Sequence, residues 1–303
     1  MDVYVNFKVE ERYTKIAEEI LGDSKISYYP DKHDAEIILV KNNIEIGKST
    51  MMIQTISAGV DHLDLSHVPE SVMVCSNAAA YSVSVGEHAM ALILSKAKNI
   101  IENDADMKAR KFRQSPTMLL RSKTIGIIGY GGIGREVARL SRAFGMRVIS
   151  FGRGEGDENT DEHHHEISPL LEKSDIIVLS IPLTDRTRNM INYRTLTAMK
   201  RAKMLVNVAR YGLVNKDDMI RFLNEKPDFS YLSDVWWNEP DITNTEIKNT
   251  ILSPHVAGGM SGEIMDLAFR SAFENIKNFI AGNPGNVVKR SEYTVNGGKF
   301  TGV

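Results

Sequence analysis

The amino-acid sequence predicts an α/β protein of two domains, each built on a parallel β-sheet that is covered by helices. Short apolar runs alternate with helical patterns along nearly the whole chain, which is typical of parallel sheets with helical crossovers. One helical stretch, near 86–111, is long enough to connect two such series. The length of 303 residues also fits about two domains better than one.

The first series of elements predicts a small α/β domain of the flavodoxin-like kind. A strand is expected at 3–7 and a helix at 9–21, where apolar side chains recur on one face. Four further apolar runs are expected to be strands, at 26–29, 36–40, 51–56 and 72–75.

The connecting helix has a clear start in the sequence. Ser84 is followed three residues later by Glu87, the spacing of a capping box at a helix N-terminus. A polar stretch containing Pro116 ends the helical pattern before the next strand. We therefore expect one helix over 86–111 between the two domains.

The second series predicts a Rossmann-type doubly wound sheet, because six strands make a complete dinucleotide-binding fold. Its strands are expected at 124–129, 147–151, 175–180, 203–208, 230–235 and 250–253, and its helices at 132–144, 168–173, 195–200 and 215–225. A last helix should run from an N-cap at Ser261 to about residue 281 and return the chain to the first domain. The expected division is therefore a discontinuous substrate domain, 1–92 with 268–303, and a dinucleotide-binding domain, 93–267.

The composition excludes several classes of function. Lys plus Arg (37) nearly balances Asp plus Glu (39), and the net charge of -2 argues against nucleic-acid binding. Cys75 is the only cysteine, which excludes disulfides and Cys-based zinc sites within one chain. The first residues do not resemble a signal peptide, and no apolar run is long enough to span a membrane. We expect a cytoplasmic protein without a metal site, membrane contact or nucleic-acid partner.

The strongest local signal is a glycine-rich turn between a strand and a helix. Gly129, Gly131 and Gly134 form the pattern GxGxxG directly after an apolar strand. Gly129 permits the tight turn, Gly131 lets the backbone approach a pyrophosphate, and Gly134 allows close helix–strand packing. The first helical turn, with Gly132 and Ile133, offers N–H groups to phosphates. Turn glycines alone would give the same letters, but the strand–turn–helix context favours a dinucleotide site.

The residues after the second strand of that domain bear on the choice of cofactor. NAD enzymes usually place Asp or Glu there to accept a hydrogen bond from the ribose 2′-hydroxyl, whereas this chain has Arg153. A guanidinium can bind the 2′-phosphate of NADP through charge-assisted hydrogen bonds. The alternative is a solvated loop arginine, with Glu155 and Asp157 close by. We predict NADP as the preferred cofactor, with NAD possible.

Three consecutive strands of the second domain each end beside a polar side chain: Arg210, Glu239 and His255. Ligands bind at the carboxyl ends of strands in open α/β sheets, so we predict that this trio forms a site. The alternatives are a surface cation, a turn residue before proline and a loop histidine. The trio suits carbonyl reduction of an acid, since a guanidinium can bind a carboxylate and polarise a keto oxygen. A carboxylate beside an imidazole favours the protonated ring, which can act as a general acid.

The other histidines are weaker candidates. For the three at 163–165, in an acidic hydrophilic tract, a solvated loop is favoured over a metal site. His88 lies in the first turns of the connecting helix, where packing at the domain junction is the favoured interpretation. Three more lie beside turns and are expected at the surface: His33, His62 and His67.

The motifs NVAR at 207–210, DVWWNEP at 234–240 and SPHVAGG at 253–259, placed after GxGxxG, resemble those of the D-isomer-specific 2-hydroxyacid dehydrogenases. The resemblance covers nearly the whole chain and includes ISAGVDHLDL at 56–65, SVGEHAMALIL at 84–94 and IPLTDRTRNMIN at 181–192.

This resemblance implies a role for each matching position. Arg210 would bind substrate, His255 would be the acid–base residue, and Glu239 would orient it. The backbone N–H groups of the 56–65 loop would hold the substrate carboxylate, at Ala58, Gly59 and Val60. The cofactor would lie near three further residues, of which the first faces the nicotinamide carboxamide: Asp234, Pro182 and Thr187. The resemblance also suggests a homodimer.

The chain departs from the family pattern at four places. Tyr211 follows Arg210 where glycine is usual, and Gly86 stands where alanine is common. The stretch 77–80 lacks a frequent proline, and the acid after the second strand is missing.

The resulting hypothesis is an NADP-preferring 2-keto acid reductase, with glyoxylate or hydroxypyruvate as leading substrates. A 3-phosphoglycerate dehydrogenase is the nearest alternative enzyme, although no added phosphate-binding cluster is visible. A formate or phosphite dehydrogenase is a further alternative. A non-catalytic dinucleotide-sensing protein, like the related C-terminal-binding-protein corepressors, would have the same fold, but the long interaction tails of that class are absent.

Overall fold

The computed structural model describes residues 1–31, 34–243, 245–259 and 261–293, and it has the α/β class that the sequence predicts. The chain divides into two compact units: unit 1, Met1–Tyr81 with Gly259–Val303, and unit 2, Ser82–Gly258. Both changes between units come earlier in the chain than the expected ones after residues 92 and 267. His33 and residues 294–303, for which we made predictions above, lie outside the described residues.

Unit 1 contains a five-stranded parallel sheet of order β2-β1-β3-β4-β5. This order is the flavodoxin-like one. The strands are β1 (Val3–Val5), β2 (Ile26–Tyr28), β3 (Ile37–Val40), β4 (Met52–Thr55) and β5 (Met73–Cys75), one in each region where the sequence predicts a strand.

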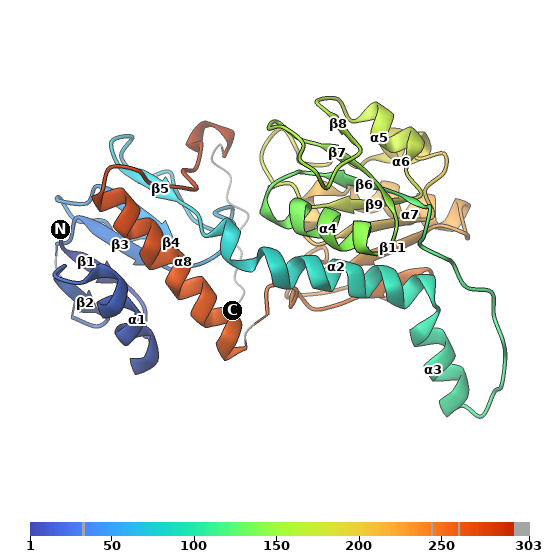
Figure 1. Ribbon diagram of the computed structural model, residues 1–303, viewed down its shortest axis with the longest axis horizontal. Helices are drawn as coiled ribbons and strands as arrows, with labels where there is room; N and C mark the ends of the chain where they lie inside the picture. The colour runs from blue at the N-terminus through green and yellow to red at the C-terminus, as the bar shows by residue number, and fades with distance from the viewer. Residues whose placement is uncertain (32–33, 244, 260, 294–303) are drawn as a thin grey trace. The chain divides into compact units, whose positions relative to one another are not determined.

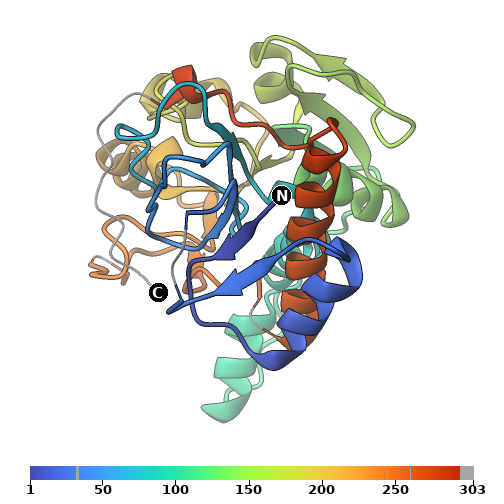
Figure 2. The same ribbon diagram turned by 90° about the vertical axis from the view of Figure 1, so that its left-hand side faces the viewer.

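Two helices from opposite ends of the chain lie side by side on one face of this sheet (Figure 2). They are α1 (Glu11–Leu21) and α8 (Gly262–Ile280), and the rings of Tyr13 and Phe269 stack between them with centroids 4.0 Å apart. Arg12 also donates a 2.7 Å hydrogen bond to the Gly262 carbonyl, so α8 belongs to unit 1 from its first turn. This contact explains why unit 1 resumes before residue 268.

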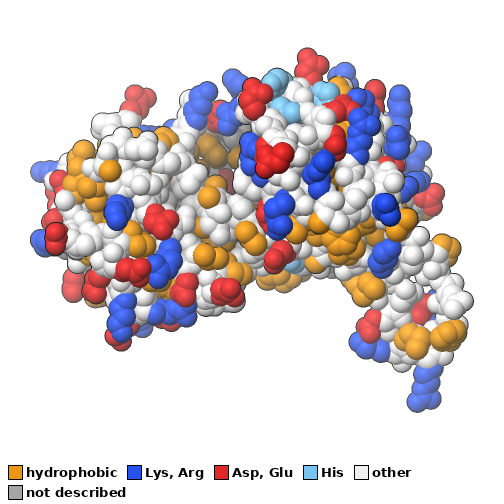
Figure 3. Space-filling model, viewed as in Figure 1, with side chains coloured by type: hydrophobic (Ala, Val, Ile, Leu, Met, Phe, Trp, Pro, Cys, Tyr) orange, Lys and Arg blue, Asp and Glu red, His pale blue; other side chains and the backbone are white. Residues whose placement is uncertain are grey.

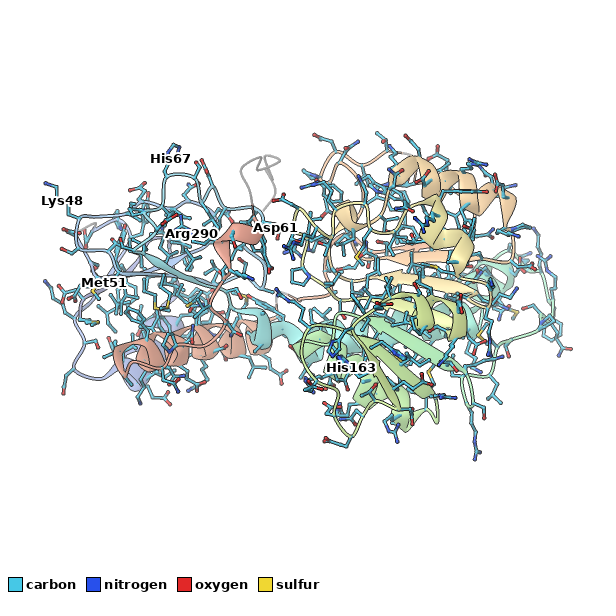
Figure 4. All side chains as sticks on the ribbon, turned by 90° about the horizontal axis from the view of Figure 1, so that it is seen from above. Lys48, Met51, Asp61, His67, His163 and Arg290 are labelled. Atoms are coloured by element: carbon cyan, nitrogen blue, oxygen red, sulfur yellow. The ribbon has the colours of Figure 1, made fainter. Side chains whose placement is uncertain are left out.

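The C-terminal part of unit 1 continues into η3 (Arg290–Glu292), a short 3₁₀ helix. Arg290, labelled in Figure 4, donates a 2.6 Å hydrogen bond to the carbonyl of Pro69 and further bonds to the carbonyls of Leu65 and Val68. One guanidinium thus ties this segment to the loop before β5.

The predicted connecting helix is two helices, α2 (Ser82–Ala97) and α3 (Ile100–Lys108). Asn99 interrupts them with a left-handed backbone (φ 50°), which Asn tolerates better than most residues, and its amide donates to the Pro116 carbonyl at 2.9 Å. The predicted capping box is also wrong, because α2 begins at Ser82 and Ser84 lies inside the helix. Helix α2 packs on α4 (Gly132–Ala143), so its residues belong to unit 2 (Figure 1).

Unit 2 contains a seven-stranded parallel sheet of order β12-β11-β10-β9-β6-β7-β8. Within this sheet the chain runs from β6 through β7 to β8 at one edge. It then crosses to β9 on the other side of β6 and continues to β12 at the opposite edge, as in doubly wound folds. The strands are β6 (Thr124–Ile128), β7 (Arg147–Phe151), β8 (Glu162–His164), β9 (Ile176–Leu179), β10 (Met204–Asn207), β11 (Ser230–Ser233) and β12 (Thr250–Leu252).

Short helices connect these strands: α5 (Ser168–Lys173), α6 (Tyr193–Ala198), the 3₁₀ helix η2 (Tyr211–Leu213) and α7 (Lys216–Glu225). Apolar side chains between helices and sheet form the core, with Leu170, Leu205 and Tyr231 fully buried. Among the described residues, no helix has the length and apolar character needed to cross a membrane.

The seventh strand, β8, corrects a prediction. We expected a solvated loop at 163–165, but Glu162–His164 pair with β7 at the sheet edge. His163, labelled in Figure 4, lies on this strand, and its Nδ1 is 2.8 Å from the hydroxyl of Ser150 on β7. The described part of the chain contains no group of three His, Cys, Asp or Glu side chains that could hold a metal ion.

Candidate active site

The glycine-rich turn between β6 and α4 has the geometry of a phosphate cradle. Gly129 has φ 102°, and a Cβ there would lie 2.7 Å from the backbone of Ser180. A Cβ at Gly134 would lie 2.1 Å from the Gly129 carbonyl oxygen, so only glycine fits where α4 passes β6. A Cβ at Gly131 would meet nothing within 4 Å, which leaves space above the turn.

The first turn of α4 adds hydrogen-bond donors to this space. Gly131 is the N-cap and provides no side chain to bind the first N–H groups. Those N–H groups, including Gly132 and Ile133, have no partner within the helix, and the helix dipole favours an anion there. These features fit a dinucleotide pyrophosphate.

The loop after β9 is fixed beside the glycine-rich turn. Ser180 donates from Oγ to the Gly129 carbonyl at 2.8 Å. Further along, the Thr187 hydroxyl donates to the Pro182 carbonyl at 2.7 Å and accepts from the Thr184 N–H at 2.8 Å. Pro182 and Thr187 therefore lie in one closed turn at the point where the strand order reverses.

The carboxyl end of β7 is followed by Gly152 and the exposed Arg153. Asp157, in the same loop, accepts a 2.5 Å hydrogen bond from the Tyr130 hydroxyl and forms an ion pair with Arg135. Burial alone would raise the pKa of Asp157, but these bonds outweigh it and hold the pKa below its usual range. The negative charge of Asp157 is thus already paired with a cation.

His255 and Glu239 form a close pair. Nδ1 of His255 lies 2.9 Å from Oε1 of Glu239, and Oε2 of the same carboxylate accepts the Trp236 N–H at 2.9 Å. The histidine side chain is 38% exposed, whereas the glutamate side chain is 11% exposed. A carboxylate can only accept, so this pairing places a proton on Nδ1 and turns Nε2 to the opposite side of the ring.

The two tryptophans of DVWWNEP, Trp236 and Trp237, are buried beside the turn that contains Glu239. Each is 5% exposed, and their ring centroids are 4.6 Å apart. The indole of Trp236 donates to the Thr243 carbonyl at 2.8 Å, and that of Trp237 to the Val214 carbonyl at 2.9 Å. Both side chains are therefore buried supports of the Glu239 turn.

Asp234, only 2% exposed, organises the loop that contains His255. Its carboxylate accepts the N–H groups of Val256 at 2.9 Å and Ala257 at 2.8 Å, and the Ser253 hydroxyl at 2.6 Å. Its backbone carbonyl accepts the N–H of His255 at 2.7 Å. These hydrogen bonds of Asp234 within the chain were not predicted from the sequence.

Arg210 follows β10 through a turn fixed by Asn207. The buried Asn207 amide donates to the Arg210 carbonyl at 3.0 Å, and its carbonyl oxygen accepts the Ala209 N–H at 3.1 Å. Arg210 itself is half-buried and donates from Nη1 to the Ala209 carbonyl at 2.8 Å. Arg210, Glu239 and His255 accordingly follow the carboxyl ends of three adjacent strands, β10, β11 and β12.

The remaining predicted residues, Ala58, Gly59 and Val60, belong to unit 1, in the loop after β4. The Ser57 hydroxyl donates to the Gly59 carbonyl at 2.9 Å, and the Ser57 carbonyl accepts the Asn77 N–H at 3.0 Å. Ala58 and Gly59 are half-buried, while the side chain of Val60 packs in the core of unit 1.

Residues 90–257, more than half of the chain, match the NAD binding domain of the D-isomer specific 2-hydroxyacid dehydrogenases. This protein belongs to that family. It is therefore an NAD(P)-dependent oxidoreductase of the 2-hydroxyacid dehydrogenase type, as the sequence motifs predict.

Individual relatives agree with this assignment. The chain is 32% identical to a glyoxylate reductase of Thermococcus gammatolerans, over 70% of this chain and 68% of the relative. It is 30% identical to a hydroxypyruvate reductase of Thermotoga maritima, over 70% of this chain and 72% of the relative. A solved structure of a glycerate dehydrogenase related protein from Thermoplasma acidophilum is 55% identical, covers 92% of this chain and 100% of its own, and superposes with a TM-score of 0.72.

Two departures of this 2-hydroxyacid dehydrogenase from its family pattern have a structural explanation. Tyr211 starts η2, a helical conformation that any residue adopts, so glycine is not required there. A Cβ at Gly86 would lie 2.6 Å from Cγ of Glu136, so glycine lets α2 approach α4 closely.

The sequence alone did not predict the residues whose hydrogen bonds hold the predicted site residues in place. Asn207 was visible as part of the NVAR motif, and its place at a strand end was a signal for a turn-capping role. The contacts of Ser84 and His88 with loop 253–257 had no such signal, because they join positions about 170 residues apart.

Proposed function

We propose that this protein reduces a small 2-keto acid to a D-2-hydroxy acid with NADPH, and that glyoxylate and hydroxypyruvate are its leading substrates. The observation that carries this proposal is the His255–Glu239 pair, with Nδ1 and Oε1 2.9 Å apart at the carboxyl end of the unit 2 sheet. Such a pair is suited to general acid–base catalysis, because the carboxylate orients the ring and stabilises its protonated form.

The proposed reaction divides the work among three side chains. NADPH, when bound, supplies the hydride that reaches the keto carbon. His255 gives the proton on Nε2 to the keto oxygen, so that C=O becomes CH–OH and the ring is left neutral. Glu239 holds Nδ1 and stabilises the ring while it is charged. Arg210 binds the substrate carboxylate and polarises the keto oxygen through its planar guanidinium.

The cofactor is assigned to the cradle of unit 2. Gly129, Gly131 and Gly134 shape the turn, and the N–H groups of Gly132 and Ile133 would bind the pyrophosphate. Pro182, Thr187 and Asp234 are proposed near the ribose and nicotinamide. The substrate carboxylate is assigned to the backbone N–H groups of Ala58, Gly59 and Val60 in unit 1.

Two observations support NADP over NAD. Arg153, an exposed cation, follows β7 where an NAD enzyme usually has an acid. Asp157, the carboxylate whose charge would repel a 2′-phosphate, is ion-paired with Arg135 and hydrogen-bonded by Tyr130. A 2′-phosphate would therefore meet Arg153 with little opposing charge from Asp157.

A homodimer is also proposed, formed through α3 and the segment that follows it. These residues extend away from the sheet of unit 2 (Figure 1). They expose large apolar side chains (Figure 3). The exposed fractions are 56% for Ile100, 50% for Ile101, 59% for Met107, 82% for Phe112 and 66% for Leu119. Exposed apolar clusters of this kind mark protein–protein contacts.

The experiment that tests the proposed function is NADPH and NADH oxidation, measured side by side with glyoxylate, hydroxypyruvate, pyruvate, a branched 2-keto acid and 3-phosphohydroxypyruvate. We expect turnover with glyoxylate or hydroxypyruvate and a preference for NADPH. A strong preference for the phosphorylated substrate would replace the proposal with a 3-phosphoglycerate dehydrogenase. Cofactor binding without turnover of any substrate would favour a dinucleotide-sensing protein.

A further inference from the structure

The loop that contains His255 is held at both ends by helix α2. Ser84 and His88 are four residues apart and therefore lie on the same face of that helix. The Ser84 hydroxyl donates to the Ala257 carbonyl at 2.7 Å, and Nε2 of His88 lies 2.8 Å from the hydroxyl of Ser253. These two contacts bracket His255, which is two residues from each of the bonded positions.

The hydrogen bonds around Ser253 run in one direction. Its single hydroxyl proton is donated to Oδ1 of Asp234 at 2.6 Å, so the same oxygen must accept from His88. Nε2 of His88 therefore carries a proton, and it also lies 3.4 Å from Oδ1 of Asp234. The result is a chain of donors from His88 through Ser253 to a carboxylate that is almost completely buried.

Asp234 connects this chain of donors to the backbone beside His255 through further hydrogen bonds. Its carboxylate accepts the N–H groups of Val256 and Ala257, and its own carbonyl accepts the N–H of His255. His255 has φ 54°, a left-handed conformation that is uncommon for a residue with a side chain. Such a backbone persists only where its surroundings hold it, and Asp234 provides those bonds.

We propose that His88 is a positioning residue for His255 and acts through Ser253 and Asp234. The inference rests on the proposed function, in which His255 exchanges the proton with the substrate. Without the N–H of His88, Ser253 loses the donor that orients its hydroxyl, and Asp234 loses the N–H group that lies 3.4 Å from its Oδ1. The loop then relaxes, and the imidazole of His255 leaves the position from which it can protonate a keto oxygen.

The test compares two substitutions of His88 with a matched control on the same helix. His88→Leu removes the donor at similar volume, whereas His88→Gln keeps an N–H donor of similar reach. Leu92→Ala truncates a buried apolar side chain of α2, which has no hydrogen-bonding group and so is not part of this chain of donors. We expect His88→Leu to lower kcat about 10- to 100-fold with a small change in KM, as a displaced catalytic group does. We expect His88→Gln to restore most of kcat, and Leu92→Ala to lower Tm without lowering kcat.

A double-mutant cycle separates positioning from a general structural role. If His88 acts through His255, then adding His88→Leu to His255→Asn should change the remaining rate less than about twofold. The remaining rate is measured by single-turnover oxidation of bound NADPH with hydroxypyruvate. NADPH binding, measured by fluorescence titration, should be unchanged in every variant.

Two results would overturn the inference while the wild-type chain is active. The first is that His88→Leu keeps the wild-type kcat. The second is that His88→Leu lowers the rate by the same factor in the His255→Asn background as it does in the wild-type chain. Inactivity of the wild-type chain with both cofactors and all five keto acids would instead overturn the proposed function, and the inference would fall with it.

Discussion

Nδ1 of His255 lies 2.9 Å from Oε1 of Glu239, and the second oxygen of that carboxylate accepts the backbone N–H of Trp236. Both oxygens of Glu239 are therefore engaged by donors at fixed positions. A side chain with one oxygen and one amide nitrogen cannot satisfy both donors.

The first prediction concerns this arrangement. Glu239→Gln should lower kcat by about 10²-fold, because general acid–base catalysis contributes roughly 10²–10⁴-fold and here loses its orienting carboxylate. The measurement is steady-state reduction of hydroxypyruvate with NADPH. Glu246→Gln, at an exposed carboxylate of the following segment, is the control and should keep the wild-type rate. A normal kcat in Glu239→Gln would contradict the role given to this pair.

The second prediction concerns the shape of the cation at Arg210. Arg210→Lys should remove most of the activity although it keeps the charge, since an ammonium cannot make the planar paired contacts of a guanidinium. The measurement is kcat/KM for glyoxylate and hydroxypyruvate. A loss smaller than about threefold would mean that Arg210 acts as a simple charge or not at all.

The third prediction concerns cofactor choice. Arg153→Ala should reduce kcat/KM for NADPH about tenfold and leave that for NADH nearly unchanged, because only NADPH has the 2′-phosphate that a charge-assisted bond would hold. Arg194→Ala, at an exposed arginine on α6, tests for a general effect of charge and should preserve the ratio. An unchanged ratio in Arg153→Ala would make Arg153 a solvated loop residue.

The fourth prediction concerns acid stability at the β8 edge. The ion pair with Lys173 is the largest influence holding the pKa of Glu162 below its usual range, and His164 and Arg147 add to it against the opposing effect of burial. A lowered folded-state pKa gives stability that is present above the unfolded pKa, about 4.3. That stability is lost as the pH falls through the folded pKa.

Glu162→Gln should therefore lower Tm by about 2–4 °C at pH 7, the effect of roughly 1 kcal/mol in a domain of this size. The difference should shrink as the pH falls below the unfolded pKa of about 4.3, and it should vanish below the lowered folded-state pKa, where the wild-type carboxyl is also protonated. Glu158→Gln, at another carboxylate of the 155–162 segment, is the comparison. Calorimetry at both pH values measures the difference, and a gap that stays constant with pH would exclude the ion-pair explanation.

The sequence alone could predict most of the fold, because its signals are local. Each predicted strand exists, and the GxGxxG pattern marks the turn that the structure builds between β6 and α4. The division of 86–111 at Asn99 was not predictable, since the left-handed residue depends on a hydrogen bond to the distant Pro116. Strand β8 was hidden because its polar side chains lie at a sheet edge, where alternation of apolar residues is weak.

The candidate site, too, could be predicted from the sequence only in part. Arg210, Glu239 and His255 could be proposed as a site because each follows a strand, and strand ends can be recognised in the sequence. The contacts that fix them are long-range: Ser253 and His88 meet across 165 positions, and the Trp237 indole bonds to Val214. Such contacts follow from tertiary packing, so no local sequence pattern predicts them.

The role of His255 as proton donor is tested most directly by the effect of His255→Asn on the reduction of hydroxypyruvate by NADPH. Asn keeps a polar side chain at this position but cannot give a proton from a ring nitrogen, so kcat should fall about 10²–10⁴-fold. NADPH binding should stay at the wild-type level. Near-normal turnover in this variant would contradict the assignment of His255 as the proton donor, and with it the proposed mechanism.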